Sequence, residues 1–463
     1  MAGIGFKIQK LLAEDTYWGM VKGYFFSAVI SSGPWLISII CIGTLGMLFQ
    51  PILGTKEHHV FRAWVTYCYA ASLVISGATQ VSLTRYISDL IYKKEDEGVF
   101  ASYVSYSLPT FVLNAILAAL YLGWHGHPWP FVYGGAILYA VINQIWIAMI
   151  YLSAAKDYIT IVLGYLLGGG MSVGGSYLLV ERYGLKGLVF GYTLGQLALL
   201  AILTSRIVIE FPKGKIFDGA CFRYLWTHPN LLLIGFFYNG AIWVDKLIYW
   251  IFKGEKISAG LWASSFYETP TFLAFVTIVP TLSIFLVRIE TSFYRAYKTY
   301  YNKVIEKYPL NEILKEKQKI SESLALSFYK LIIYQGTITT LSLIFAPSII
   351  SKFKMESFQL GVLRITILGA FVHAMLMVLM IIILYFDWKG LALKVNILFF
   401  ASNFALTWYF IGFDVTWQGY GYFLSCVITF CFALWMFLRR WENLEYITFT
   451  SQPLGGLSWD ENP

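Results

Sequence analysis

Ionisable side chains inside two long apolar stretches are the residues of this chain that could do chemistry. The stretch 230–252 contains the adjacent residues Asp245 and Lys246, and the stretch 258–287 contains Glu268. Both stretches are long enough to cross a bilayer as helices. Ionisable groups at such depth are costly and tend to face a protein interior or a water-filled cavity. These residues are therefore candidates for a transport path, and the alternative is a buried ion pair that only holds two helices together.

The depth of each group predicts which of them meet. If the first stretch ends near Phe252, Asp245 lies about 10 Å from that end at the rise of a helix. Glu268 follows Ser258 by ten residues, which places it about 15 Å from the same side. Because the two helices are adjacent in the chain, we expect Lys246 to pair with Glu268. That pairing would leave Asp245 free to face a cavity.

Further polar and aromatic residues within apolar segments extend this candidate path. Amide groups donate and accept hydrogen bonds, as sugar hydroxyls require, and aromatic faces can stack on sugar rings. The remaining candidates for a substrate path are Trp35, Gln80, Arg85, Asn239, Trp243, Arg288, Arg364 and His373. The alternative for the aromatic residues is a position facing lipid or in an interfacial belt. The alternative for His373 is a hydrogen-bonded packing residue.

The composition explains why ionisable residues in apolar stretches stand out. Of 463 residues, 58% are hydrophobic and 13% are charged, whereas a soluble domain has about 25% charged residues. The chain is therefore predicted to be a polytopic membrane protein. Its net charge of +8 does not indicate nucleic-acid binding, because the basic residues lie between apolar segments. The five cysteines lack metal-ligand spacing, Walker A and H-E-x-x-H sequences are absent, and neither a metal, a cofactor nor an enzyme activity is predicted.

Twelve apolar segments are long enough to be membrane-spanning helices. Their approximate limits are 24–49, 62–91, 101–123, 130–153, 158–180, 185–208, 230–252, 258–287, 323–350, 360–386, 389–411 and 415–438. With the N-terminus in the cytoplasm, the cytoplasmic ends and loops contain 23 lysines and arginines, and the outer ones contain nine. Because positive residues concentrate on the cytoplasmic side, both termini are predicted to be cytoplasmic, which requires an even number of spans.

Two longer connections divide the chain. The first separates six segments from six, and the second joins the eighth segment to the ninth. The expected organisation is an amphipathic interfacial segment at 1–22, an N-terminal six-helix lobe at 23–208, a cytoplasmic linker at 209–229, a C-terminal six-helix lobe at 230–440 with a cytoplasmic loop at 289–322, and a cytoplasmic tail at 441–463.

The two halves of the chain align weakly with each other. The aligned stretches are 31–36 with 238–243, 83–92 with 286–295, and 183–196 with 413–426. Arg85 thereby matches Arg288. The consistent order of the matches supports a six-plus-six duplication, and parallel repeats around a central cavity are a recurrent transporter plan.

The loop 289–322 alternates Tyr and Phe with Lys, Arg and Glu. An amphipathic helix at the membrane interface is its expected state. The alternative is a docking surface for a cytoplasmic partner, and the candidate docking residues are Tyr294, Arg295, Lys298 and Tyr301.

Three stretches carry a resemblance to a known family. The opening MAGIGFKIQKLLAEDTYWGMVKGYFFSAVISSGPW closely resembles the N-terminus of the PelG family, the inner-membrane transporters of Pel exopolysaccharide systems. WVDK at 243–246 and FYETPTFLAFVTIVPTLSIFLVRIETSFYRAY at 266–297 are similar to that family too. The family belongs to the multidrug/oligosaccharidyl-lipid/polysaccharide exporter (MOP) superfamily, whose members have two six-helix lobes around a central cavity.

The resemblance implies a location in the bacterial cytoplasmic (inner) membrane. It also implies export of a growing polymer rich in N-acetylated hexosamines, received from a cytoplasmic glycosyltransferase, in a complex with the other membrane Pel subunits. It carries over no substrate residues. The prediction is an all-α integral membrane protein, with twelve transmembrane helices in two six-helix lobes around a central cavity.

Three functions remain open from the sequence. The leading hypothesis is polysaccharide export coupled to a synthase, through a cavity lined by the first, second, seventh and eighth segments. The second is a cation-coupled exporter of small solutes, or a flippase for a lipid-linked oligosaccharide, with Asp245 or Glu268 as the coupling carboxylate. The third is a membrane scaffold that transports nothing and recruits the synthase through 289–322.

Overall fold

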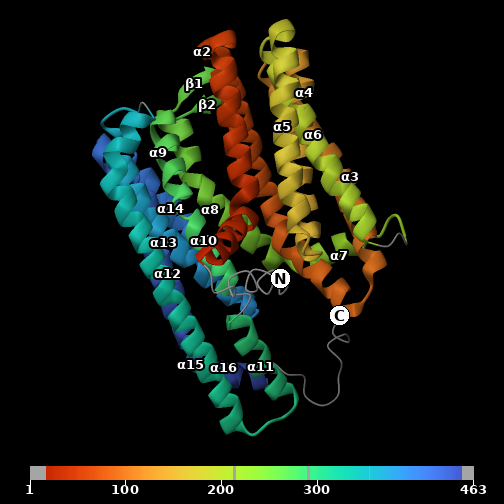
Figure 1. The fold of residues 1–463 in the computed structure, drawn as a ribbon, viewed down its shortest axis with the longest axis vertical. Coiled ribbons are helices and arrows are strands. Elements are labelled where there is room, and N and C mark those ends of the chain that lie inside the picture. The colour runs from red at the N-terminus through yellow and green to blue at the C-terminus, as the bar shows by residue number, and fades with distance from the viewer. Residues whose placement is uncertain (1–16, 212–214, 289–291, 354, 451–463) are drawn as a thin grey trace.

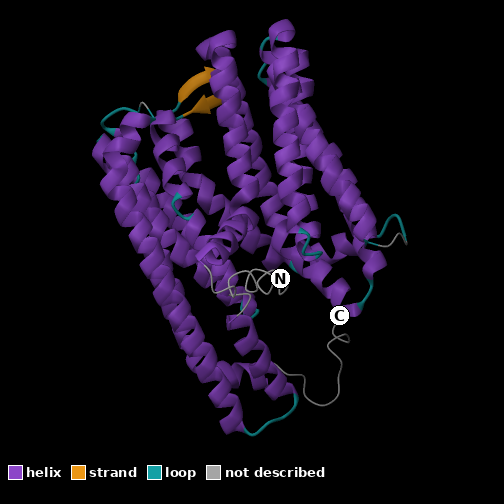
Figure 2. Cartoon of the chain, in the orientation of Figure 1, coloured by secondary structure: helices purple, strands orange, loops and turns teal. Residues whose placement is uncertain are grey.

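A computed structural model describes residues 17–211, 215–288, 292–353 and 355–450, with the backbone alone for 17–31, 283–284 and 286–288. Nearly all of these residues are helical (Figure 2). Most of the predicted interfacial segment 1–22, and the tail beyond residue 450, lie outside the described residues.

Long helices form the body of the molecule (Figure 1). The N-terminal half contains α2 (Tyr17–Lys93), α3 (Asp96–Trp124), α4 (Trp129–Ala154), α5 (Tyr158–Tyr183) and α6 (Leu185–Glu210). The C-terminal half contains α8 (Pro229–Lys253), α9 (Ser265–Val276), α10 (Val279–Arg288), α12 (Leu310–Lys352), α13 (Gln359–Tyr385), α14 (Lys389–Phe410) and α15 (Tyr420–Glu442). Shorter helices are α7 (Ala220–Thr227), α11 (Tyr294–Ile305), η2 (Val415–Trp417) and α16 (Leu444–Thr450).

The structure is consistent with twelve spans but divides the predicted segments differently. Ten helices of the described chain are long and apolar enough to cross a membrane. α2 contains the first two segments in one helix that bends at Gly54, where φ is 77° and ψ is 166°. Glycine adopts such a backbone because it has no Cβ. α9 and α10, of 12 and 10 residues, together cover most of the predicted eighth segment.

A small β-hairpin replaces the helix that the sequence predicts from Ser258. Strands β1 (Glu255–Ser258) and β2 (Leu261–Ala263) pair antiparallel. Gly260 in the turn has a φ of +72°, a region that strains L side chains. α9 begins only at Ser265, so the predicted start of the eighth segment is wrong.

Each half of the chain buries its own core. The C-terminal half has one large apolar cluster, and the N-terminal half has two, around Trp64 and around Tyr151. The two lobes meet where α2 packs on α8 and α10. Here a Cβ added at Gly235 would lie 2.1 Å from the carbonyl oxygen of Gly77. Small residues therefore allow the two backbones to approach closely.

In the described part of the predicted interfacial helix at 289–322, which is residues 292–322, two helices form a hairpin in place of one helix. α11 leads into α12, whose 43 residues extend about 65 Å at the helical rise. Because the apolar core of a bilayer is about 30 Å thick, one helix of this length extends beyond it. α16 is joined to α12 by the Lys317–Glu445 ion pair at 2.8 Å. The β-hairpin and α11 lie at opposite ends of the molecule (Figure 1), which we call the hairpin end and the α11 end.

Candidate functional site

Asp245 and Lys246 form an ion pair inside the C-terminal lobe. Both lie on α8, where Asp245 is fully buried and Lys246 is 8% exposed. The ammonium Nζ of Lys246 lies 3.0 Å from Oδ1 and 3.1 Å from Oδ2 of Asp245. Consecutive residues of a helix do not face each other, so the long lysine side chain bends back toward its neighbour. It also donates to the carbonyl oxygen of Ile242 at 2.8 Å.

Aromatic residues complete the surroundings of this pair. The Tyr267 hydroxyl of α9 donates to Oδ2 of Asp245 at 2.7 Å. Lys246 Nζ lies 5.1 Å from the ring centroid of Phe275 and 5.6 Å from that of Tyr422. Ammonium groups are attracted to aromatic faces at such distances. The two charges therefore neutralise each other within a shell of hydrogen bonds and rings.

His373 lies close to this pair, behind Tyr422. It is fully buried on α13, and its Nδ1 lies 2.8 Å from the Tyr422 hydroxyl. Its Nε2 has no hydrogen-bond partner within the described part of the chain. The arrangement agrees with a hydrogen-bonded packing residue.

Glu268 does not meet Lys246, so the predicted pairing is wrong. Because α9 begins at Ser265, Glu268 lies in the first turn of that helix and near the hairpin end. Its Oε1 accepts the backbone N–H of Ser264 at 2.7 Å and the indole N–H of Trp250. A carboxylate at this position satisfies a free N–H and is stabilised by the positive end of the helix dipole.

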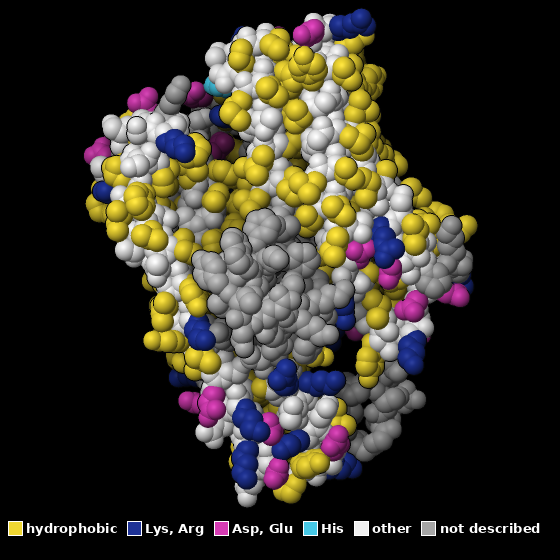
Figure 3. Space-filling view, viewed as in Figure 1, with side chains coloured by type: hydrophobic (Ala, Val, Ile, Leu, Met, Phe, Trp, Pro, Cys, Tyr) yellow, Lys and Arg dark blue, Asp and Glu magenta, His cyan; other side chains and the backbone are white. Residues whose placement is uncertain are grey.

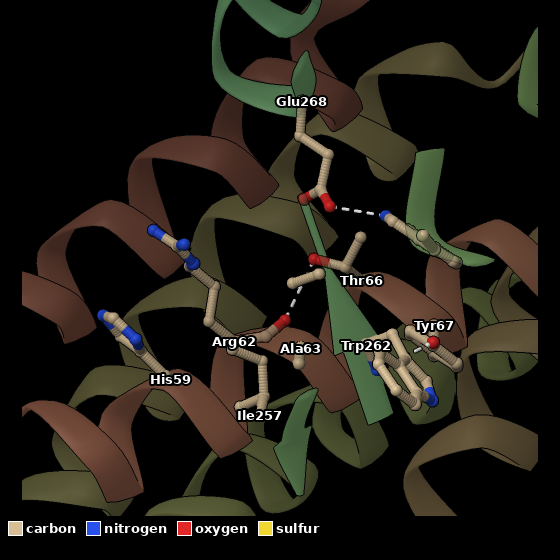
Figure 4. A pocket seen from close by; sticks show the side chains of 10 residues that line it. His59, Arg62, Ala63, Thr66, Tyr67, Ile257, Trp262 and Glu268 are labelled. Atoms are coloured by element: carbon tan, nitrogen blue, oxygen red, sulfur yellow. Dashed lines mark hydrogen bonds between the residues drawn. The ribbon is translucent and has the colours of Figure 1, made fainter. Parts of the chain in front are cut away.

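Glu268 also lines a small pocket between the two lobes (Figure 4). α2 contributes His59, Arg62, Ala63, Thr66 and Tyr67, and the C-terminal lobe contributes Trp250, Ile257, Trp262, Ala263 and Glu268. The space left is about 10 Å³, room for about one water molecule. The pocket combines a guanidinium, a carboxylate and aromatic faces, which suit a ring rich in hydroxyls, and in this conformation it is closed.

Aromatic contacts close the pocket. Tyr67 of α2 stacks on Trp250 of α8 with ring centroids 4.5 Å apart. The Tyr67 hydroxyl accepts the backbone N–H of Trp262 at 3.0 Å. Trp243, a predicted path residue, lies with its ring centroid 6.2 Å from that of Trp250.

The β-hairpin is tied to the N-terminal lobe by further hydrogen bonds. The Tyr121 hydroxyl donates to the carbonyl oxygen of Gly260 at 2.6 Å. Nε2 of His127 lies 2.8 Å from the carbonyl oxygen of Ala259. Beside the hairpin, Arg62 donates to the hydroxyl of Ser265 at 2.9 Å. These contacts come from different segments of the N-terminal lobe, so the hairpin joins the lobes at this end.

Gln80 belongs to a polar face of α2. Gln80 and Ser88 are exposed, and Thr84 between them is half-buried. Side chains four residues apart share one face of a helix. Arg85 beside this face reaches the C-terminal lobe, where it pairs with Asp387 at 2.7 Å. The polar face and this ion pair lie toward the α11 end of α2.

The other predicted path residues are dispersed. Trp35 is half-buried against the ring of Phe272, 5.7 Å away between centroids. Asn239 is half-buried at the contact of α8 with α2. Arg364 is exposed on α13. Arg288 ends α10, and its side chain lies outside the described atoms.

The predicted docking residues lie on α11. Arg295 and Lys298 are exposed, and Tyr294 is half-buried. Tyr301 is half-buried against Tyr297, with ring centroids 4.6 Å apart. Figure 3 shows many Lys and Arg side chains, with some acidic ones, toward the α11 end of the visible face.

Sequence reasoning did not identify Arg62, Tyr67, Trp250 or Tyr267 as site residues. Arg62 and Trp250 lie at the ends of apolar segments, where basic and aromatic residues commonly mark topology or a membrane interface. Their shared pocket depends on contacts between α2 and the C-terminal lobe, and no local pattern signals it.

Comparison with known proteins decides the family. The family model described as "PelG: Putative exopolysaccharide Exporter (EPS-E)" matches residues 1–449. The chain belongs to the PelG family. No curated protein matches it. As a member of an exporter family, the chain is a membrane transporter.

Solved structures of MOP superfamily transporters are similar to this PelG-family chain. A MATE transporter in the straight conformation has a TM-score of 0.63 at 13% identity, covering 90% of this chain and 96% of its own. An outward-facing multidrug resistance MATE family transporter has a TM-score of 0.61 at 12% sequence identity, with the same coverage of both chains. A MOP superfamily transporter from Pyrococcus furiosus Vc1 (DSM3638) has a TM-score of 0.60 at 13% sequence identity, again with the same coverage of both chains. At such identity the likeness shows the fold, which is that of the MOP superfamily.

Proposed function

We propose that this PelG-family chain carries a growing exopolysaccharide across the bacterial cytoplasmic membrane. The polymer is Pel-like, rich in N-acetylated hexosamines, and comes from a cytoplasmic synthase. The observation that carries the proposal is the pocket between the lobes, where Arg62, Glu268 and aromatic faces meet in a member of an exporter family.

The chemistry of the pocket fits a saccharide. Hydroxyl and acetamido groups both donate and accept hydrogen bonds, so a guanidinium and a carboxylate can bind them from two sides. The apolar faces of sugar rings can stack on Tyr67, Trp250 and Trp262, the last of which is 39% exposed. Because a 10 Å³ space cannot hold a sugar ring, passage requires the hairpin to separate from the N-terminal lobe.

The route runs along α2 between the lobes. The polymer enters at the α11 end, follows the polar face of Gln80, Thr84 and Ser88, and leaves through the pocket. Polar side chains exposed at membrane depth favour a water-filled or protein-lined space over lipid. The excess of lysines and arginines predicted for the cytoplasmic side includes those of α11, which supports a cytoplasmic position for the α11 end and for both termini.

The synthase docks at the α11 end in this proposal, beside the other membrane Pel subunits. Arg295 and Lys298 present exposed positive charge on α11. They suit an acidic surface on the partner, because complementary charge steers association and fixes register.

Reconstitution in vesicles tests the proposal. The chain and an active synthase are placed in one bilayer with the synthase facing outward, and polymer protected from an added glycoside hydrolase is measured. We expect Trp262→Ala to lower the protected polymer at least tenfold and Glu268→Gln to lower it several-fold. Trp129→Ala is the matched control, because Trp129 is 65% exposed and lies outside the pocket. Unchanged export in both pocket variants would contradict the route.

The same vesicles separate a transporter from a scaffold. A transporter protects polymer that vesicles with synthase alone do not protect. If adding this chain brings the synthase to the bilayer but protects no additional polymer, the chain is a scaffold and the proposed export function is wrong.

A further inference from the structure

Asp245, one of the two carboxylates that the sequence offers for cation coupling, forms an ion pair with Lys246 in the C-terminal lobe. A carboxylate that binds a passing cation needs an oxygen that solvent or the cation can reach. Asp245 has no exposed surface, and both of its oxygens accept hydrogen bonds within the lobe. Its charge is therefore already matched from inside the protein.

Lys246 is held in place as firmly as Asp245. An ammonium has three donors, and its Nζ contacts both oxygens of Asp245 and the carbonyl oxygen of Ile242. The rings of Phe275 and Tyr422 cover it further. Moving the amine away from Asp245 would leave a buried carboxylate unpaired, which is strongly unfavourable.

The position of Lys246 next to Asp245 in the chain further favours their ion pair over a pair of Asp245 with a cation from solution. Lys246 follows Asp245 directly in the chain, so its ammonium competes as a tethered group at high effective concentration. A sodium ion or a proton from solution would have to displace it. We propose that Lys246 is a resident counter-ion of Asp245, so that Asp245 does not couple transport to a sodium or proton gradient.

This inference bears on the energy source of the proposed export and, for that consequence, rests on the proposed function. Without cation coupling at Asp245, elongation by the synthase is the energy source that this inference favours for moving the polymer. The inference also contradicts the cation-coupled alternative in its form with Asp245 as the coupling carboxylate.

Binding of sodium to the purified full-length protein tests the ion pair without any export assay. We expect wild-type protein to bind no more ²²Na⁺ than the Asp245→Asn variant. Lys246→Met leaves the carboxylate without its counter-ion, so we expect Asp245-dependent binding of sodium, or a melting temperature that rises by several degrees in sodium or acid. Lys256→Met removes an exposed lysine of β1 and is expected to behave as wild type. A folded Lys246→Met protein that responds to neither sodium nor acid would overturn the inference.

Folding of the variants has its own control. Removing both charges, with Asp245→Asn and Lys246→Met together, is expected to recover most of the melting temperature lost in Lys246→Met alone, because no buried charge is left unpaired. If Lys246→Met does not fold, the comparison of sodium binding between wild type and Asp245→Asn still tests the inference. Wild-type protein that binds sodium, together with an Asp245→Asn variant that does not, would overturn it.

Export in vesicles provides the second readout. With an active synthase, we expect wild-type export to agree within twofold in sodium-free choline buffer, under a sodium gradient and under a pH gradient. A tenfold fall without either gradient would overturn the inference. No export under any condition would refute the proposed function instead, and the sodium-binding result would stand separately.

Discussion

Tyr67 of α2 and Trp250 of α8 stack across the two lobes, with ring centroids 4.5 Å apart and ring planes 5° from parallel. Aromatic rings have two faces that can bind an apolar surface, and here each ring covers one face of the other. The stack therefore closes the pocket at the hairpin end with the ring surfaces that the proposed function assigns to a sugar.

Removing this stack should loosen the hairpin end. An aromatic pair contributes about 0.5–1.5 kcal/mol beyond its buried area, so we expect Tyr67→Ala to speed deuterium uptake at the backbone amides of 255–263. Tyr177→Ala is the control, because Tyr177 is 64% exposed on α5. Equal uptake in the two variants would show that the stack does not hold the hairpin.

The turn of the hairpin should tolerate glycine alone. Gly260 has a φ of +72°, and a Cβ there would lie 2.4 Å from Cδ2 of His125. We expect Gly260→Ala to weaken the contact of the hairpin with the N-terminal lobe by about 1–3 kcal/mol. The measurement is deuterium uptake at 255–263. Gly123→Ala, where a Cβ would meet nothing within 4 Å, should leave uptake unchanged.

Contact between the lobes should depend on Gly235. A Cβ at this position would lie 2.1 Å from a backbone oxygen of α2, so the helices must move apart. We expect Gly235→Ala to cost about 1–3 kcal/mol, the usual effect of overpacking. Thermal unfolding in detergent measures the loss, and Gly361→Ala, which would meet nothing within 4 Å, is the matched variant. A melting temperature equal to that of Gly361→Ala would refute close packing here.

Charge on α11 should control binding of the synthase. Replacing Arg295 and Lys298 by Glu reverses exposed charge on one helix, and we expect affinity for the synthase to fall at least tenfold while the melting temperature stays unchanged. Lys315→Glu is the control, because Lys315 is exposed on α12. Wild-type affinity should also decrease as salt increases, because salt screens exposed charges. Equal losses in the variant and its control would indicate a general effect of charge and no specific docking site.

The class of the protein and its helical segments could be predicted from the sequence because both depend on composition over long windows. A run of about twenty apolar residues can cross a bilayer as a helix, because a helix satisfies its backbone N–H and C=O groups within the same segment. The linker predicted at 209–229 rests on an equally local signal, polar sequence between apolar runs, and the division into six spans and six stays a prediction. The helices consequently fall where hydrophobicity places them, from α3 at Asp96–Trp124 to α15 at Tyr420–Glu442.

Irregular elements within the apolar segments could not be placed in this way. Residues 258–263 of the hairpin are apolar enough to resemble the start of a span, yet Gly260 turns the chain there. α12 continues through the predicted loop because its polar first turns also favour a helix. Hydrophobicity marks where a helix can cross the membrane, and it does not mark where the helix begins.

Partners of the charged residues were decided by tertiary structure. The sequence by itself determined that Asp245, Lys246 and Glu268 belong to apolar stretches of the chain and need a partner or water. The predicted pair of Lys246 with Glu268 rested only on their similar depths in adjacent apolar segments. In the folded protein the lysine bends back to Asp245, and Glu268 caps α9 beside Trp250. Which groups meet depends on the rotation of each helix about its axis and on where α9 starts, and packing between distant segments sets both.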